Sequence, residues 1–507
     1  MSKATVPSIV PAVRYCLLNL LLSLFITQTA FTQLNGTYTI GKDGDFKTFT
    51  GAAAELNKTG VSGPVTFSVQ NGIYEEQFTL GLINNTAPHL RVIFRSESGN
   101  PEDVTLRFAA ASKEENFIVR LQASQHIEFR DITFEATGLG RVFYLEASAG
   151  NIVVAGCTLS GIYNTNAVAD PALIFSQDPN LENLNIIGNR FLSCSFGVYL
   201  QGAFNNYIHG LRFLDNIFSN TGYASINLIQ VNNPLISGNT IQGGYFGIHV
   251  TSGAGLTLVK NSVSVSGHGI RLNYVGNLVP GLIANNFIRV DGVSESYGLD
   301  IQNSSWMNVY HNTVVINTHM ASARAFNCSS NTAGTINVIN NSFSCMNEGY
   351  ASYVQYPATL LQSDHNNYYS ASSMMFYRGQ KAYDLADLKM LGAHDQHSIS
   401  VWPGHLSDTD LHVYTGWMAG KGSPLSEVTE DIDGDPRSTL RPDIGADEFS
   451  TGTMFLPPLS GDYTIGPGQT YETLQSAIDV MKTRGISGPV RLRLTAGIHD
   501  EQAELVT

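Results

Sequence analysis

The stretch that decides the fold contains six variants of one short strand: FGVYLQ (196–201), ASINLI (224–229), FGIHVT (246–251), HGIRLN (268–273), YGLDIQ (297–302) and RAFNCS (324–329). Each variant follows a corner, and before each corner stands an Asn that recurs at intervals of roughly 22 to 29 residues: Asn189, Asn216, Asn239, Asn261, Asn286, Asn312 and Asn341. A repeat of this length is typical of a solenoid, in which stacked coils share one apolar core.

Strand periodicity predicts which side chains fill that core. Within FGIHVT, Ile248 and Val250 point to one face, because side chains alternate along a strand. Gly247, His249 and Thr251 are then expected on the other face. The corresponding inward pairs are Val198/Leu200, Ile226/Leu228, Ile270/Leu272, Leu299/Ile301 and Phe326/Cys328. Because a buried amide is costly without partners, we expect the recurring Asn residues to form a ladder that bonds each coil to the next.

These repeats resemble the right-handed parallel β-helix of secreted bacterial proteins in the pectin-lyase-like superfamily. The segment ending in PDIGADEF (442–449) is also similar to the C-terminal closure of large proteins of that kind. The resemblance implies an all-β solenoid with a short N-terminal helical cap and an irregular C-terminal cap. It does not specify the activity, because this fold serves lyases, hydrolases, adhesins and passive stalks.

The first 32 residues have the pattern of a secretory signal peptide. Lys3 and Arg14 supply positive charge before an apolar run from Cys16 to Ile26, which is too short to span a membrane, and Ala30-Phe31-Thr32 precedes Gln33 as a cleavage site. No later stretch is apolar enough to cross a bilayer. We therefore expect a secreted or cell-surface bacterial protein.

The formal charge of −14 argues against nucleic acid and anionic membrane surfaces as partners. Charged residues make up only 14% of the chain, so much of the surface is neutral and polar, which suits sugars or protein contacts. No motif requires a cofactor. Buried thiols are favoured over one disulfide for the remaining cysteines, whose spacing matches no zinc or redox motif: Cys157, Cys194, Cys328 and Cys345.

The organisation of the chain follows from these segments and from an internal repeat. We divide it into a signal peptide (1–32), an N-terminal cap with the first coils (33–110), β-helix coils (111–380), a closure (381–449), a linker (450–460) and a second module (461–507). The cap includes an expected helix over 46–58, and the closure includes one over 385–391. GDYTIG (461–466) repeats GTYTIG (36–41), and GISGPV (485–490) repeats GVSGPV (60–65). We therefore expect residues 461–507 to be the start of a second, truncated β-helix.

Stacking the outward positions of the repeated strand produces a candidate site. One column contains Tyr199, Asn227, His249, Arg271, Asp300 and Asn327, and the next contains Asn273 and Gln302. A third column is almost entirely small, and we expect it to lie beside the first and let a flat chain approach: Gly197, Ser225, Gly247, Gly269, Gly298 and Ala325. Coils stack at about 4.8 Å, so His249, Arg271 and Asp300 would be consecutive neighbours. The longer loop 163–170 is expected to overhang one face.

The main functional prediction is a secreted or cell-surface modular protein that binds polysaccharide or cell-surface glycan, or serves as a stalk or adhesin. Tyr199, Asn227, Asn273 and Gln302 are the expected carbohydrate contacts.

The alternative is a polysaccharide lyase or another polysaccharide-degrading enzyme. Arg271 would neutralise a uronate carboxylate, His249 would remove the C5 proton, and Asp300 would orient Arg271. Pectate lyases of this fold hold calcium with an Asp/Glu cluster that this face lacks. A glycosidase is less favoured still, because Asp300 has no second carboxylate beside it. An exposed ionic ladder without catalytic function is the simpler interpretation.

Two groups in the closure are candidates for a metal ion. Asp431, Asp433 and Asp435 alternate like the start of a calcium loop, but the glycine stands at the fourth place instead of the sixth, so a tight turn is the alternative. The other group matches no standard metal spacing: His394, His397, His405 and His412, with Asp395 and Asp410.

Overall fold

The computed structural model describes residues 32–276, 279–292, 295–371, 375–449, 458–466, 469–471 and 473–497. The signal peptide, except for its last residue, and most of the linker lie outside the described residues. Within the described ranges, no helix has the length and apolar character needed to cross a membrane.

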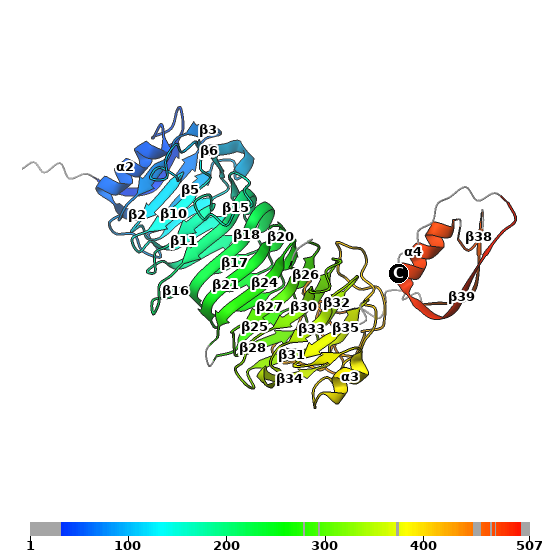
Figure 1. Ribbon diagram of the computed structural model, residues 1–507. Helices are drawn as coiled ribbons and strands as arrows, with labels where there is room; N and C mark the ends of the chain where they lie inside the picture. The colour runs from blue at the N-terminus through cyan, green and yellow to red at the C-terminus, as the bar shows by residue number, and fades with distance from the viewer. Residues whose placement is uncertain are drawn as a thin grey trace, which may run out of the picture.

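The chain forms a parallel β-helix, as predicted, in which equivalent strands of successive coils pair in register (Figure 1). The pairing connects the strands into three columns, here called sheets one, two and three. Sheet one contains β1 (Leu34–Ile40), β2 (Val61–Val69), β5 (Val92–Ser96), β8 (Ile127–Arg130), β11 (Gly150–Ala155), β14 (Glu182–Ile187), β16 (Ile208–His209), β17 (Arg212–Leu214), β19 (Leu235–Ser237), β22 (Thr257–Val259), β25 (Gly281–Ala284), β28 (Met307–Tyr310), β31 (Ile336–Ile339) and β34 (Leu360–Asp364).

Two long strands, β15 (Arg190–Gln201) and β18 (Ile217–Asn232), belong to both remaining sheets because they bend around a corner. Sheet two also contains β3 (Gly72–Glu75), β6 (Val104–Phe108), β9 (Thr133–Ala136), β12 (Thr158–Ser160), β20 (Thr240–Gly243), β23 (Ser262–Val265), β26 (Phe287–Val290), β29 (Thr313–Ile316), β32 (Ser342–Cys345) and β35 (Asn367–Ser370). Sheet three also contains β4 (Phe78–Leu80), β7 (Val119–Gln122), β10 (Phe143–Glu146), β13 (Ile174–Ser176), β21 (Phe246–Ala254), β24 (His268–Val275), β27 (Tyr297–Gln302), β30 (Arg324–Cys328), β33 (Tyr350–Val354) and β36 (Phe376–Arg378).

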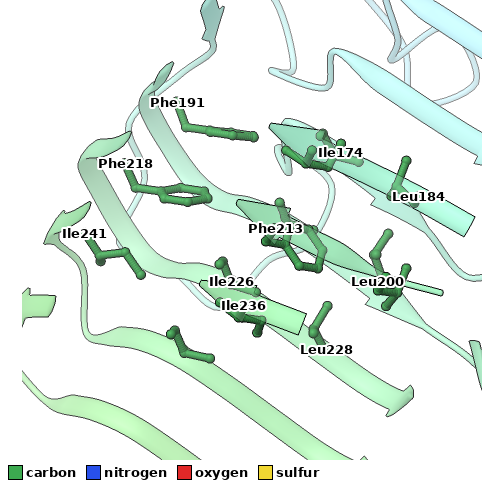
Figure 2. Close-up of a cluster of buried hydrophobic side chains, with 14 of the residues drawn as sticks. Ile174, Leu184, Phe191, Leu200, Phe213, Phe218, Ile226, Leu228, Ile236 and Ile241 are labelled. Carbon is green, nitrogen blue, oxygen red and sulfur yellow. The ribbon is translucent and has the colours of Figure 1, made fainter. Parts of the chain in front are cut away.

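Side chains from all three sheets converge on one apolar interior (Figure 2). Every predicted inward pair is at most 1% exposed. The rings of Phe191 and Phe218 stack in neighbouring coils with centroids 4.4 Å apart, so side chains of one type also form ladders along the axis. The four predicted thiols are buried and unpaired, and burial raises the pKa of Cys157, Cys194 and Cys345 to about 12.

The predicted Asn ladder runs through the corner between sheets one and two. Asn261 shows the pattern: its Oδ1 accepts the backbone N–H and the Nδ2–H of Asn239, and its own Nδ2 donates to Asn286 Oδ1 at 3.0 Å. The ladder extends one coil further than predicted, to Asn366, whose backbone N–H donates to Ser398 Oγ at 2.9 Å. Each buried amide is therefore satisfied by its neighbours in the coils above and below.

The residue before each ladder Asn has a left-handed backbone, which turns the corner in one step. It is glycine at Gly188 and Gly238, where φ is +63° and +69°. At other coils it is a residue that tolerates this region less well, such as Lys260 or His365. The recurring dipeptides that end in a ladder Asn, such as Gly188-Asn189 and Lys260-Asn261, are thus the sequence signature of the corner.

One orientation expected from strand alternation is wrong. The column of small residues points into the core and does not lie on the outer surface: a Cβ at Gly247 would lie 2.4 Å from Val263 Cγ1, and one at Gly298 would lie 2.1 Å from Val314 Cγ1. Ser225 and Ala325 are fully buried. The pairing of β21 with β24 passes over Gly247, because the chain bends there, and two consecutive residues can then face inward.

The N-terminal end of the core is covered by α2 (Phe49–Thr59), which begins three residues later than expected. Phe46 bridges to Ile40, and the Thr48 hydroxyl accepts the N–H of Gly51 as the helix cap. The carboxylate of Glu76 accepts the N–H groups of Phe49 and Thr50, which further stabilises the helix N-terminus.

At the other end, β37 (Lys381–Ala382) and α3 (Leu385–Met390) begin an irregular closure, drawn in yellow in Figure 1. The buried Asp395 carboxylate accepts hydrogen bonds from Ser363, Tyr368 and Ser398 and pairs with Arg378 at 2.6 Å. Short 3-10 turns lie at Pro101–Asp103 and Pro357–Thr359.

After this cap the chain returns along the Asn corner of earlier coils. Asn340 Nδ2 donates to the Ser423 carbonyl, and His311 Nδ1 donates to the Gly445 carbonyl. Asn285 Nδ2 donates to the Glu430 carbonyl and its Oδ1 accepts from Arg437. The closure is therefore a strap over several coils as well as an end cap.

The repeated sequence near the C-terminus has a repeated structure. β38 (Leu459–Ile465), α4 (Leu474–Arg484) and β39 (Ile486–Leu494) form a separate two-stranded unit. Gly461 pairs with Val490 as Gly36 pairs with Val65. Ile486 and Leu494 are 56% and 50% exposed, whereas Val61 and Val69, their equivalents in β2, are fully buried. The second-module assignment stays a prediction that this likeness supports.

Candidate functional site

The predicted outward column lies on sheet three, in the expected order. Parallel pairing places Tyr199 beside Asn227, then His249, Arg271, Asp300 and Asn327 in successive coils. The same register continues in both directions: Tyr144 and Phe175 precede Tyr199, and Tyr353 and Tyr377 follow Asn327. We call this set the outer column; its centre is polar and its two ends are aromatic.

Asp300 is the hub of the polar centre and is fully buried. Its carboxylate lies 3.0 Å from His268 Nδ1 and 3.6 Å from Arg271 Nε. It also accepts the Nδ2–H of Asn327 at 2.6 Å and the Nε2–H of Gln302 at 3.1 Å. With its oxygens surrounded by these donors and closed to solvent, Asp300 holds its neighbours in place and does not itself meet a ligand.

His249 is neutral and engaged on both ring nitrogens. Its Nδ1 lies 3.0 Å from Asn227 Oδ1 and its Nε2 lies 3.2 Å from the Thr251 hydroxyl. Burial, with a smaller contribution from the positive charge of Arg271, lowers the pKa of His249 to about 4. Because the Nε2 lone pair accepts from Thr251 and the basicity is low, this ring is poorly suited to remove a carbon-bound proton.

Arg271 carries the accessible charge of the centre. Its side chain is 25% exposed, and its Nη2 donates to Gln302 Oε1 at 3.1 Å. The guanidinium also lies 5.7 Å from the centroid of the Phe246 ring. Gln302 thus fixes the direction of this cation, and Asp300 lies beside it; the orienting role of Asp300 stays a prediction.

The residues predicted to contact carbohydrate differ in how exposed their side chains are to a ligand. Asn227 is only 4% exposed and is occupied by His249. Tyr199 is partly exposed, and its hydroxyl donates to Gln201 Oε1 at 3.0 Å. Asn273 and Gln302 are also partly exposed, and Asn273 Oδ1 accepts from Asn303.

Sequence reasoning missed a second line of side chains that stands three positions before the outer column. It contains Phe196, Phe246, His268, Tyr297 and Arg324. The small residues that follow them in each strand had been expected to border the outer column instead. His268 is nearly buried between the rings of Phe246, at 4.9 Å, and Tyr297, at 4.9 Å. The first letter of each repeated strand, mostly aromatic or cationic, was the available signal.

Joined by Tyr223, which belongs to neither line, the two lines make an unbroken chain of ring contacts along the outside of sheet three. From one end it passes through Tyr144, Phe175, Tyr199, Phe196, Tyr223, Phe246, His268 and Tyr297, with consecutive centroids 4.9–5.7 Å apart. The chain continues through the Arg324 guanidinium, whose Cζ lies 5.1 Å from the ring centroid of Tyr297 and 3.5 Å from that of Tyr353. The rings of Tyr353 and Tyr377 then stack with centroids 4.5 Å apart. We call this set the ring chain.

The loop 163–170 overhangs the N-terminal part of the ring chain, as expected. Ser195 Oγ donates to the Asn166 carbonyl, and Asp170 pairs with Arg141 at 3.6 Å. Ala169 packs on the cluster of Phe175 and Phe196. This loop is therefore a wall at one end of the face.

The closure distributes its acidic and histidine residues differently from either metal prediction. Asp431 Oδ1 accepts three backbone N–H groups and its Oδ2 accepts that of Glu448, so it organises a tight turn. Asp433 contacts His412 Nε2 at 2.8 Å, and Asp435 is exposed. The three carboxylates do not converge on one point, and a calcium ion there stays a prediction.

The crowded histidines also separate. Within the described ranges, two groups bring donor atoms within 4.8 Å of one another: Asp364 with His365 and His397, and His412 with Asp433 and Asp447. His394 and His405 belong to neither group.

Residues 172–360 match the family model described as the right handed beta helix region, so the solenoid is right-handed. No curated protein matches the chain. Similar solved structures include pectate lyase Pel9A (12% identity, 83% of this chain and 98% of that one, TM-score 0.34).

Two further examples are the periplasmic alginate epimerase AlgG (9% identity, 65% and 76% covered, TM-score 0.35) and a lacto-N-biosidase from Eubacterium ramulus (8% identity, 72% and 66% covered, TM-score 0.34). Likeness at this level carries no argument about the activity of the chain.

Proposed function

We propose that this protein is a secreted or surface-exposed β-helix that binds polysaccharide along the outside of sheet three. The observation that carries the proposal is the set of partly exposed tyrosines in the ring chain, namely Tyr144, Tyr199, Tyr223, Tyr353 and Tyr377; the other rings of the chain are buried. Aromatic faces pack against the apolar faces of sugar rings, and fixed polar groups bond their hydroxyls. On sheet three the outer column presents aromatic groups at its two ends and polar groups between them.

The dimensions suit an extended glycan that lies parallel to the solenoid axis. From Tyr199 to Tyr353 the outer column crosses six coil steps, which is about 29 Å at roughly 4.8 Å per step. Arg271 offers one cation near the middle, and Gln302 and Asn273 offer amides beside it. A polymer could therefore contact rings at both ends and polar groups between them.

A binding role is favoured over catalysis for two reasons. The candidate base, His249, is neutral but has both nitrogens engaged and a pKa of about 4. Asp300, the residue predicted to orient Arg271, is buried and its oxygens are occupied by protein donors. A lyase remains the second candidate because Arg271 and His249 are adjacent. In that mechanism the hydrogen bond between the Thr251 hydroxyl and His249 Nε2 would have to break before the imidazole could act as a base.

The test uses the purified chain with a panel of neutral and acidic polysaccharides, measured by calorimetry and by ultraviolet absorbance of unsaturated uronate ends. We expect binding without a rise in absorbance. Tyr353→Ala should weaken binding about fivefold to tenfold, the effect of losing one stacking contact of ~1 kcal/mol. Tyr383→Ala, at a tyrosine of the closure that is 59% exposed, is the matched control.

Absence of binding to every polymer would refute the proposal. An equal loss of affinity in Tyr353→Ala and Tyr383→Ala would show that the polysaccharide does not bind on sheet three. A rise in absorbance that Arg271→Ala abolishes would establish the lyase instead.

A further inference from the structure

The pair His365 and His397 joins the last ladder coil to the closure. His365 follows β34, and His397 lies after α3 in the returning chain. Their rings stack with centroids 4.9 Å apart and planes 11° from parallel. Each ring and the Asp364 carboxylate present one donor atom within 4.8 Å of the others.

Hydrogen bonds fix the same tautomer in both rings. His365 Nδ1 lies 2.9 Å from the Lys421 carbonyl oxygen, and His397 Nδ1 lies 2.7 Å from Asp364 Oδ2. Both partners can only accept, so each Nδ1 carries the proton and each neutral ring presents an Nε2 lone pair. Metal-binding histidines are held in this way, with the second nitrogen bonded to a carbonyl or a carboxylate.

Asp364 acts as a support and not as a ligand. Its Oδ1 accepts the backbone N–H groups of His365, at 2.9 Å, and His397, at 2.7 Å, while its Oδ2 holds the His397 ring. One carboxylate thus positions both histidines.

A comparison within the solenoid separates His365 from a purely structural histidine. His311 occupies the equivalent left-handed position, with φ +51° against +54° for His365. His311 is fully buried, and both of its ring nitrogens bond protein groups, Gly445 and Asn340. His365 has the same conformational cost but uses only Nδ1 within the described residues, which leaves Nε2 for a ligand.

We propose that His365 and His397 bind one divalent transition-metal ion, of the zinc, nickel or copper type, which ties the last coil to the closure. Imidazole nitrogen is a preferred ligand of these ions, whereas calcium and magnesium prefer oxygen. Bonds of about 2.1 Å allow two nitrogens to be at most about 4.2 Å apart. Ligand atoms of the two rings already lie within 4.8 Å of each other, and a small movement of the His397 side chain, which is 68% exposed, closes the remaining gap.

The experiment titrates Zn²⁺ and Ni²⁺ into the full chain by calorimetry and repeats thermal unfolding with and without metal. His365→Asn keeps the corner, because Asn has the same left-handed role at Asn285 and Asn340, and removes the imidazole. His397→Gln removes the second ligand. His412→Gln removes the other donor cluster, and His319→Gln, at an exposed site, controls for surface histidines.

We expect one equivalent of metal to bind the chain and to raise its Tm. Each of His365→Asn and His397→Gln should raise the Kd at least about tenfold and remove the Tm shift that metal causes, measured against the metal-free Tm of the same variant, because each variant also loses a hydrogen bond to Lys421 or Asp364. His412→Gln and His319→Gln should bind like the unmodified chain. No binding, binding unaffected by the first two variants, or binding lost in His412→Gln would each overturn the proposal.

Discussion

The Nδ1 atom of His268 lies 3.0 Å from the carboxylate of Asp300 in the neighbouring coil, and both side chains are at most 1% exposed. This contact therefore stands on the outside of a β-sheet and is still sealed from water by the side chains around it. Arg271, Gln302 and Asn327 complete the enclosure.

Replacement of the hub should destabilise the solenoid. Asp300→Ala removes the acceptor of Asn327 and Gln302 and the carboxylate beside His268 and Arg271, and the loss of one partner from a buried pair costs ~3–5 kcal/mol. The free energy of unfolding, measured with denaturant, should fall by this amount. Asp408→Ala, at an exposed carboxylate, should change it by less than ~0.5 kcal/mol. Equal effects in the two variants would contradict the hub role.

The Asn ladder predicts a second large effect. Asn261→Ala removes the acceptor of two Asn239 donors and three donated hydrogen bonds of its own. Because unsatisfied buried donors and acceptors cost ~1–3 kcal/mol each, the free energy of unfolding should fall by ~3–5 kcal/mol. Asn273→Ala, in the partly exposed column, should cost less than ~1 kcal/mol in the same denaturation experiment. If Asn261→Ala changed the free energy of unfolding only slightly, water molecules or a local rearrangement must supply the lost hydrogen bonds, and the ladder would not stabilise the solenoid as predicted.

The inward orientation of the small column can be tested by adding one methyl group. Gly298→Ala places a Cβ where Val314 Cγ1 lies 2.1 Å away, so overpacking should lower the free energy of unfolding by ~1–3 kcal/mol. If this position faced outward instead, the same change would stabilise the strand slightly. Gly392→Ala, which meets no atom within 4 Å, is the control measured by the same unfolding curve.

Stability should also depend on pH through His249. Its pKa in the folded state is lowered to about 4 by burial and by nearby positive charge, below its value of 6.5 in the unfolded chain. The unfolded state therefore binds the proton first, and the free energy of unfolding should fall as pH drops from about 6.5 to about 4. His249→Gln should make this fall shallower, whereas His319→Gln should not. Identical pH profiles for the unmodified chain and His249→Gln would contradict the assignment.

The solenoid, its inward side chains and its Asn ladder could all be predicted from the sequence. Alternation along a strand places Ile248 and Val250 inside without further information, and a buried Asn such as Asn261 needs partners at a distance of one coil. The order of His249, Arg271 and Asp300 followed from the same stacking rule. Each of these inferences depends only on a regular strand and a regular repeat.

The site itself depends on geometry that local periodicity does not contain. Alternation fails at Gly247 and Gly298, because the chain bends there and two adjacent residues face the core. That bend places His268, instead of a small residue, on the outer side of the sheet beside Asp300, where neighbouring side chains bury it. The return of the closure to Asn340 and His311, and the meeting of His397 with His365, depend on how a distant irregular segment folds back. Repetition along the chain thus determined the coils, and only tertiary packing decided which side chains meet on their surface.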